Sequence, residues 1–247
     1  MAHLQGRERA VYVRDMFDRI AGRYNLMNRL MTFGQDLKWR RFVVQQARLP
    51  AGGRLLDLAT GTGDIAFEAL RAVPDLQVVG ADFSLPMMRV GQGQTDGGRV
   101  GWLGADALDL PFPDNTFDAV TSGYLVRNVI DIPRTLQEQL RVLKPGGRIV
   151  ILDSAPPPDN LLRPFILFYL RFVIPTLGRL VSGDAAAYEY LPSSTQAFKT
   201  PNELAAIMRA AGVVNVQYRT FMFGTMAVHW GEKAGLTAPA APALTEP

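Results

Sequence analysis

Cysteine is absent from the sequence, and histidine occurs only twice, at His3 and His229. The absence of cysteine excludes disulfide bonds, thiolate nucleophiles and zinc sites that use thiolate ligands. The two histidines lie too far apart in the chain to indicate a metal site. We therefore expect no bound metal and a structural role for His229.

A dense basic face is also missing. Lysine and arginine number 26 against 23 acidic residues, which leaves a net charge of +3. Proteins that bind nucleic acid usually combine a denser basic face with interleaved aromatic residues, so we expect no nucleic acid partner. Much of the basic excess lies within residues 7–41, and attraction to an anionic membrane surface therefore stays open.

Long uninterrupted apolar segments are lacking as well. The first ten residues contain no apolar core of a signal peptide, so we expect a cytoplasmic protein, with peripheral contact to the inner face of the membrane left open. Arginines and prolines interrupt the most apolar region, residues 156–200. A membrane-spanning helix needs about 20 predominantly apolar residues without such charges. The region therefore predicts a helical insertion that covers a site or rests on a bilayer.

Short apolar runs alternate with helical patterns from Arg54 onward. A helix over residues 133–143 is expected to end at Lys144, which favours a helix C-terminus, and at the glycines that follow. This alternation predicts an α/β fold with a mostly parallel, seven-stranded sheet and helices on both faces. The predicted strands are residues 54–59, 77–83, 100–107, 117–124 and 148–155, and a closing pair lies within 215–233.

The chain divides into three parts by pattern. Residues 12–48 keep helical spacing, with a break near Gly34. We therefore expect an N-terminal helical cap over residues 1–50 and a main domain over residues 51–233, with its insertion at about 156–200. The last residues, 234–247, are rich in alanine and proline and predict a disordered tail.

A glycine-rich loop follows the first predicted strand, in the stretch LDLATGTGDIA. Gly61 and Gly63, with Ala66 in the third position, satisfy the dinucleotide-binding pattern in its alanine-tolerant form. The same spacing suits the loop by which methyltransferases hold S-adenosylmethionine. Asp82 ends the second strand, where an acidic side chain can bind ribose hydroxyls, but both cofactors carry a ribose.

Three features favour the methyl donor. A pyrophosphate needs the positive end of a helix, whereas Asp57 and Asp64 surround this loop with negative charge, which suits the ammonium group of S-adenosylmethionine. Asp106 and Ala107 lie at the end of the third predicted strand, where they can hold an adenine edge. The tyrosine–x3–lysine pair of the short-chain reductases is absent from the chain.

The motifs and their order resemble the ubiquinone and menaquinone biosynthesis C-methyltransferases, which have the class I Rossmann-like methyltransferase fold. The resemblance extends from about Val13 to Lys233. Its most selective pieces are MFDRIAGRYNLMNRLMTFG, RNVID and YEYLPSS, whereas LDLATGTGD and RVLKPGG occur in many methyltransferases. The resemblance implies an S-adenosylmethionine-dependent enzyme that methylates a prenylated quinol ring, namely demethylmenaquinol, 2-methoxy-6-polyprenyl-1,4-benzoquinol or both.

The resemblance also implies site residues. Arg127 and Asn128 match the family's arginine–asparagine pair beside the ring, and Tyr24 matches a tyrosine that lies over the site. With the glycine loop and its neighbours, the expected cofactor-binding residues are Asp57, Gly61, Thr62, Gly63, Asp82, Phe83, Asp106, Ala107 and Gly123.

One segment departs from the family pattern. The family commonly has serine, phenylalanine and glycine where this chain has Gly123, Tyr124 and Leu125. The missing hydroxyl weakens one expected cofactor contact, and Leu125 reshapes the substrate pocket. The departure bears on the identity of the substrate more than on the reaction.

The chemistry can be argued independently. Methylation of an aromatic carbon needs an electron-rich ring, so the substrate should be the reduced quinol. Ionisation of one phenol moves charge onto the ring carbon, and Arg127 could stabilise that phenolate by a charged hydrogen bond while Asn128 orients it. Arginine keeps its proton up to a pKa above about 12, so water or a carboxylate must take the ring proton.

Two other functions stay open from the sequence. The chain could methylate another small or lipidic acceptor, which the Tyr124 and Leu125 departures favour. It could also be a non-catalytic subunit that binds the cofactor in a quinone-synthesis complex, in which case Arg127, Asn128 and Tyr24 would be dispensable. Assembly is likewise open, and a homodimer is one candidate.

Overall fold

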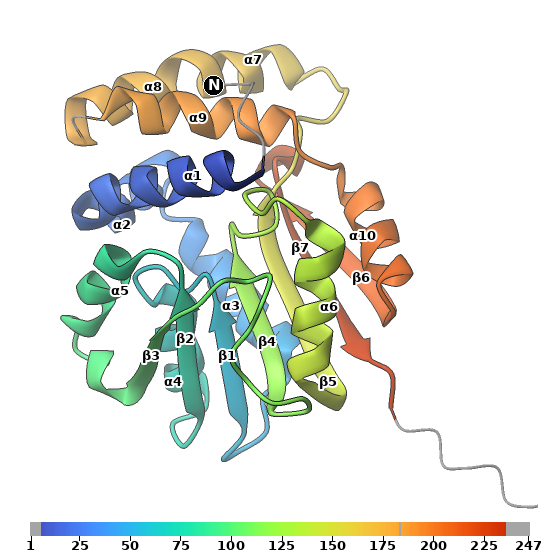
Figure 1. The fold of residues 1–247 in the computed structure, drawn as a ribbon. Coiled ribbons are helices and arrows are strands. Elements are labelled where there is room, and N and C mark those ends of the chain that lie inside the picture. Colours follow the sequence, from blue (N-terminus) through green and yellow to red (C-terminus); the bar gives the residue numbers. More distant parts are fainter. Residues whose placement is uncertain (1–5, 183, 236–247) are drawn as a thin grey trace, which may run out of the picture.

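The computed structural model describes residues 6–182 and 184–235 (Figure 1). A seven-stranded sheet forms its centre, in the order β3-β2-β1-β4-β5-β7-β6. Strands β1 to β5 run parallel, and β7 pairs antiparallel with both β5 and β6, which confirms the predicted architecture. The strands are β1 (Arg54–Leu58), β2 (Gln77–Asp82), β3 (Val100–Gly104), β4 (Phe117–Gly123), β5 (Leu143–Ser154), β6 (Val213–Phe221) and β7 (Met226–Lys233).

Helices cover both faces of the sheet and add a further layer above the carboxyl ends of the parallel strands (Figure 1). Helices α3 and α4 pack on one face, and α6 and α10 pack on the other. Two π-helical turns, Tyr169–Val173 and Gly178–Ser182, flank α8. The α-helices are α1 (Gly6–Ile20), α2 (Tyr24–Thr32), α3 (Asp36–Ala47), α4 (Asp64–Ala72), α5 (Leu85–Gln92), α6 (Ile132–Val142), α7 (Arg163–Phe168), α8 (Ile174–Leu177), α9 (Ala185–Gln196) and α10 (Pro201–Ala210).

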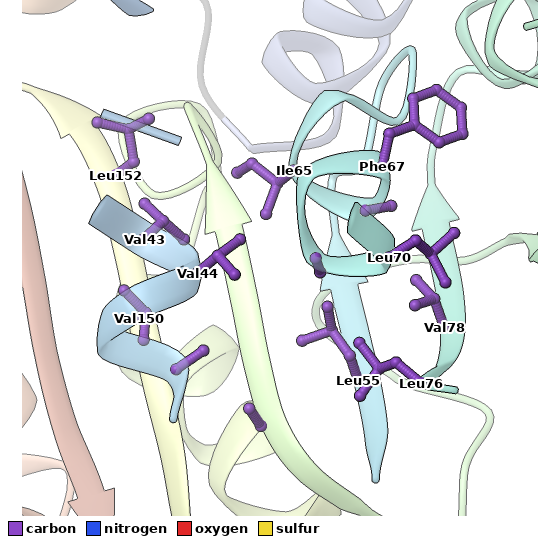
Figure 2. Close-up of a cluster of buried hydrophobic side chains, with 14 of the residues drawn as sticks. Val43, Val44, Leu55, Ile65, Phe67, Leu70, Leu76, Val78, Val150 and Leu152 are labelled. Atoms are coloured by element: carbon purple, nitrogen blue, oxygen red, sulfur yellow. The ribbon is translucent and has the colours of Figure 1, made fainter. Parts of the chain in front are cut away.

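Apolar side chains from the strands and helices fill the space on each face. Figure 2 shows one of these clusters, in which Leu55 and Val150 of the sheet pack with Val43 of α3 and Leu70 of α4. Central strands of a covered parallel sheet are buried on both faces, so continuous apolar runs such as Ile149–Leu152 are expected there. That run is at most 1% exposed. The packed sheet therefore gives the loops at its carboxyl ends a fixed base.

The upper layer combines two segments far apart in the sequence. Met16 and Ile20 of α1 and Met27 of α2 pack against Leu170 and Ile174 of the insertion. The N-terminal helices thus lie between the sheet and α7–α9 (Figure 1). Helix α3 belongs to the predicted N-terminal segment, residues 1–50, yet it packs on α4 and the sheet.

The helix predicted over residues 133–143 does not end at Lys144 as expected. Helix α6 ends at Val142, and β5 begins at once with Leu143, so Lys144 lies in a strand. Its Nζ donates to both carboxylate oxygens of Asp118, at 2.8 and 2.9 Å. This ion pair joins the start of β5 to β4 at the point where the register shifts between Phe117 and Ala119.

Two expectations concern the ends of the chain and the insertion. The predicted disordered tail, residues 234–247, lies outside the described residues except for residues 234 and 235. Within the described residues, one helical segment, Arg163–Val181, is long and apolar enough by composition to cross a membrane. It contains three arginines and packs in part on α1 and α2.

His229, for which we expect a structural role, is buried on β7. It is 2% exposed, its ring contacts the carbonyl oxygen of Pro201 through Nε2 at 2.9 Å, and its Nδ1 has no partner among the described residues. Burial lowers the pKa of His229 to about 4, from an ordinary value of 6.5. Between pH 6.5 and about pH 4, the ring is therefore neutral in the folded protein and protonated in the unfolded chain.

We expect this difference to make the free energy of unfolding fall as the pH drops from 6.5 towards 4. The pKa shift of His229 corresponds to a loss of about 3 kcal/mol in the free energy of unfolding of the wild type. A His229→Asn variant lacks this contribution and should not show the loss. Burial raises the pKa of Asp57 to about 6, which has the opposite effect in the same range, but this effect is common to both proteins. Urea titrations at several pH values measure the difference, and parallel curves for the two proteins would contradict the assignment.

Candidate active site

Two cavities adjoin each other above the carboxyl ends of the parallel strands. The polar cavity has a volume of about 520 Å³ and follows the ends of β1, β2, β3 and β4. The apolar cavity, of about 420 Å³, lies between the N-terminal helices and the insertion. Both volumes are in the range of small-molecule sites, about 300–1,000 Å³.

Aromatic side chains form a wall that the two cavities share. Phe17 of α1, Tyr24 of α2 and Tyr124 at the end of β4 line both of them. Phe17 and Tyr24 pack edge to face, with ring centroids 6.0 Å apart. Burial raises the pKa of Tyr24 and raises that of Tyr124 to about 12, so both phenols stay protonated at neutral pH.

Asp82 is the central acidic group of the polar cavity. Its Oδ2 accepts a hydrogen bond from the Gly61 N–H at 2.6 Å, and its Oδ1 accepts one from the Ser84 N–H at 2.7 Å. Burial raises the pKa of Asp82, although these two N–H groups oppose the shift. Gly61 has a φ of +56°, which favours glycine, and an added Cβ would come within 3.3 Å of Met87. The loop and Asp82 thus hold each other at the cavity wall.

The structure brings most of the predicted site residues together, but in two groups. Arg127 lines the apolar cavity, Asn128 lines the polar one, and Tyr24 lines both. The predicted cofactor-binding residues that line the polar cavity are Gly61, Asp82, Phe83, Asp106, Ala107 and Gly123.

Asp57, Thr62 and Gly63 do not line the polar cavity. Asp57 is 1% exposed beneath the loop and accepts hydrogen bonds from the hydroxyls of Thr60 and Thr121, at 2.7 and 2.9 Å. The Thr62 hydroxyl donates to Asn25 Oδ1 at 2.7 Å, towards α2. The hydrogen bonds of Asp57 and Thr62 therefore fix the loop on its side away from the polar cavity.

Gly63 is the other glycine whose conformation the loop requires. Its φ is +84°, and an added Cβ would lie 2.7 Å from Trp102 and 2.9 Å from Phe67. Neither Gly63 nor the first turn of α4, residues 64–66, is among the residues that line the polar cavity. A pyrophosphate would need that helix end, so the geometry disfavours a dinucleotide for a different reason than the sequence suggested.

The expected negative charge around the loop is corrected as well. Asp64 forms an ion pair with Arg40, at 2.9 Å, and lies 3.8 Å from Arg29. Both arginines also pair with the buried carboxylate of Asp36. Asp64 is thus neutralised by its neighbours, and Asp82 and Asp106 are the carboxylates that line the polar cavity.

Arg127 anchors the polar side of the apolar cavity. Its side chain is 5% exposed, and its Nη1 donates to Asp153 Oδ1 at 3.2 Å and to Ser154 Oγ at 3.0 Å. The guanidinium also lies over the Tyr124 ring, 5.1 Å from its centroid. Burial raises the pKa of Asp153, and the Arg127 charge opposes that shift. The Arg127 Nε has no hydrogen-bond partner among the described residues.

Asn128 links the loop after β4 to α9. Its Nδ2 donates to the Tyr124 carbonyl oxygen at 2.7 Å, and its Oδ1 accepts from the Tyr190 hydroxyl of α9 at 3.0 Å. Because Asn128 does not line the apolar cavity, the structure favours a role in holding the loop and α9 over the expected direct contact with a ring.

A family profile described as the ubiE/COQ5 methyltransferase family matches residues 5–233, a range that includes the residues of both cavities. The chain belongs to the ubiE/COQ5 methyltransferase family. Its class I, Rossmann-like fold is confirmed by a SAM-dependent methyltransferase of Thermotoga maritima, which superposes with a TM-score of 0.62 at 20% identity over 89% of this chain and 99% of the other.

Two curated relatives of this family are similar over most of their length. A ubiquinone/menaquinone biosynthesis C-methyltransferase, UbiE, of Desulfotalea psychrophila is 53% identical over 221 residues, 90% of each chain. A demethylmenaquinone methyltransferase of Thermus thermophilus is 47% identical over 220 residues, 88% of this chain and 100% of the other.

Four side chains of the two cavities were not expected from the ubiE/COQ5 pattern. Ser84 lines the polar cavity, Ser154 and Thr195 line the apolar one, and Phe17 lines both. Ser154 carried a signal, because polar residues at the carboxyl end of a parallel strand face the ligand edge of such a sheet. Thr195 carried none, since the insertion brings it there from α9.

Proposed function

We propose that the protein is an S-adenosylmethionine-dependent C-methyltransferase that methylates a prenylated quinol ring in quinone biosynthesis. The shared wall of the two cavities carries this proposal. A cofactor in the polar cavity and a ring in the apolar cavity would meet at Phe17, Tyr24 and Tyr124. The names of the two relatives, with their quinone substrates, support the same reaction.

The residues of the polar cavity fit S-adenosylmethionine. Asp82 would take the ribose hydroxyls, and Asp106, whose Oδ1 accepts from the Leu108 N–H at 2.9 Å, would take the adenine amino group with its other oxygen. Phe83 and Met87 offer apolar surface for the base. The bound cofactor supplies an electrophilic methyl group, and the protein contributes alignment and exclusion of water.

The residues of the apolar cavity fit a reduced ring. Arg127 would stabilise the phenolate that makes the ring carbon electron-rich, because its charge is buried and its side chain lines the cavity. Arg127 is held in place by Asp153 and so acts as a fixed cation, not as a base. The long apolar walls of Leu170, Ile174 and Met31 suit a prenyl tail.

The mouth of the apolar cavity supports contact with a membrane. Phe33, Leu162, Phe165 and Phe223 line this cavity and are also exposed, by 44% to 74%. Beyond them Phe168 and Phe172 are 60% and 59% exposed on the same segment. Exposed apolar patches with basic residues among them, here three exposed arginines of residues 163–179, suit an anionic lipid surface. We propose that the protein acts in the cytoplasm, at the inner face of the membrane.

We expect a Phe168→Ser/Phe172→Ser variant to bind vesicles of phosphatidylglycerol and phosphatidylethanolamine at least about tenfold more weakly than the wild type. Sedimentation with the vesicles measures the partition coefficient. A Leu85→Ser variant, which removes an exposed apolar side chain of α5, is the matched control and should bind as the wild type does. Equal partition of all three proteins would contradict the membrane contact.

Methyl transfer from labelled S-adenosylmethionine tests the proposed function. Reduced demethylmenaquinol and 2-methoxy-6-polyprenyl-1,4-benzoquinol are offered separately, with the oxidised quinones as controls. Transfer to a ring carbon of either quinol, and none to the quinones, supports the proposal. Tight cofactor binding without transfer to any prenylated quinol would favour another acceptor, or a non-catalytic subunit.

A further inference from the structure

Two hydroxyl groups from distant parts of the chain meet on the wall of the apolar cavity. Ser154 ends β5, Thr195 lies in the last turn of α9, and their oxygen atoms are 3.0 Å apart. They are only 6% and 3% exposed, and both line the cavity. A buried pair of hydroxyls in an apolar site is costly unless its hydrogen-bonding capacity is used.

The hydrogen atoms of this pair can be counted. Arg127 Nη1 donates to Ser154 Oγ at 3.0 Å, so this hydrogen bond uses no hydroxyl proton. The two hydroxyls share one hydrogen bond, which takes one of their two protons whichever way it runs. The other proton has no acceptor among the residues that the structure describes.

Two other hydroxyls that line this cavity differ in this respect. The Thr225 hydroxyl donates to the Met222 carbonyl oxygen at 2.8 Å, and the Tyr169 hydroxyl donates to that of Met31 at 2.8 Å. Their protons are therefore committed to the protein. The Ser154–Thr195 pair keeps one proton for a ligand, and it lies beside the guanidinium of Arg127.

We propose that the Ser154–Thr195 pair donates its free proton to a ring oxygen of the acceptor, next to Arg127, and so fixes which ring carbon faces the shared aromatic wall. This assignment rests on the proposed function. Ser154, between Arg127 and Thr195, is the contact to the oxygen when Thr195 donates to it, and Thr195 then acts as a positioning residue. Two donors that converge on one oxygen define its place, whereas a lone guanidinium allows the ring to rotate.

Kinetics of matched variants test this assignment. Ser154→Ala and Thr195→Val should each lower kcat/KM for the quinol at least about tenfold, as expected when a hydrogen bond to a charged oxygen is lost. Thr195→Ser keeps the hydroxyl and should stay within about threefold of the wild type. Thr135→Val is the control and should also stay near the wild-type value, because Thr135 is buried in α6, lines neither cavity and donates its proton to the Asp131 carbonyl oxygen at 2.8 Å.

Binding gives a readout that a merely structural role would not move. The affinities of the wild type and Ser154→Ala are measured for the quinol and for an analogue in which one ring hydroxyl is replaced by hydrogen. In a double-mutant cycle, loss of the protein hydroxyl should matter at least about fivefold less for the analogue. Equal weakening for both ligands, or full activity of Ser154→Ala, overturns the assignment. Failure of the wild type to methylate any quinol would instead count against the proposed function.

Discussion

Replacement of Arg127 with alanine is expected to lower kcat for methyl transfer to the quinol by about a thousandfold, the upper range for loss of one charge-stabilising donor in a buried site. The guanidinium is buried and lies over the Tyr124 ring. Without it, a phenolate would lie in an apolar cavity with no compensating charge, so the ring would remain a protonated and weakly nucleophilic phenol. Single-turnover transfer from labelled cofactor measures the rate.

Stability must be separated from catalysis in this variant. Removal of Arg127 leaves Asp153 as an unpaired buried carboxylate, which destabilises a protein by about 3–5 kcal/mol. An Arg127→Ala/Asp153→Asn double variant should regain much of the melting temperature but none of the activity. Activity within about tenfold of the wild type in the folded double variant would show that Arg127 has no role in the reaction.

Replacement of Asp82 with alanine should raise the Kd for S-adenosylhomocysteine at least about a hundredfold. Two hydrogen bonds from ribose hydroxyls to a carboxylate are each worth about 1.5 kcal/mol or more. The variant also removes the acceptor of the Gly61 and Ser84 N–H groups, so the loop loses its fixed position. Isothermal titration calorimetry measures the affinity.

Asp118 provides the matched control for Asp82. Like Asp82, it is an aspartate of a parallel strand. It lies near the start of β4, where it binds Lys144, away from the carboxyl ends of the strands that hold the cavities. Asp118→Asn should leave the affinity unchanged. Unaltered affinity of Asp82→Ala would contradict the placement of the cofactor in the polar cavity.

The sheet could be predicted from the sequence because its signal is local. Runs such as residues 149–152 are apolar throughout, as the buried strands of a covered parallel sheet must be, and glycines or charged turns separate them from helices. The positions of Asp82 and Asp106 in the polar cavity could be predicted for the same reason, since Asp82 ends β2 and Asp106 follows β3 at the edge where ligands bind. Lys144 was misplaced because its pairing with Asp118 spans 26 residues, beyond the reach of a local pattern.

The apolar cavity could not be derived from periodicity. Its walls come from α1, α2 and the insertion, which meet only after the sheet has placed them. Thr62 and Asp64 show the complementary limit, because the motif gives their spacing but not the direction of their side chains. Their partners, Asn25 and Arg40, decide that direction, and they precede the loop by more than 20 residues.

The helices α1 and α2 contribute side chains to both cavities, and their Phe17 and Tyr24 are common to the two. A ligand that binds in one cavity and orders these two helices therefore favours binding of the second ligand in the other cavity. The two effects must be equal: the factor by which the methyl donor raises the affinity for the quinol is the factor by which the quinol raises the affinity for the methyl donor. Cooperativity of this kind follows from two rings held in common, without any movement of the sheet.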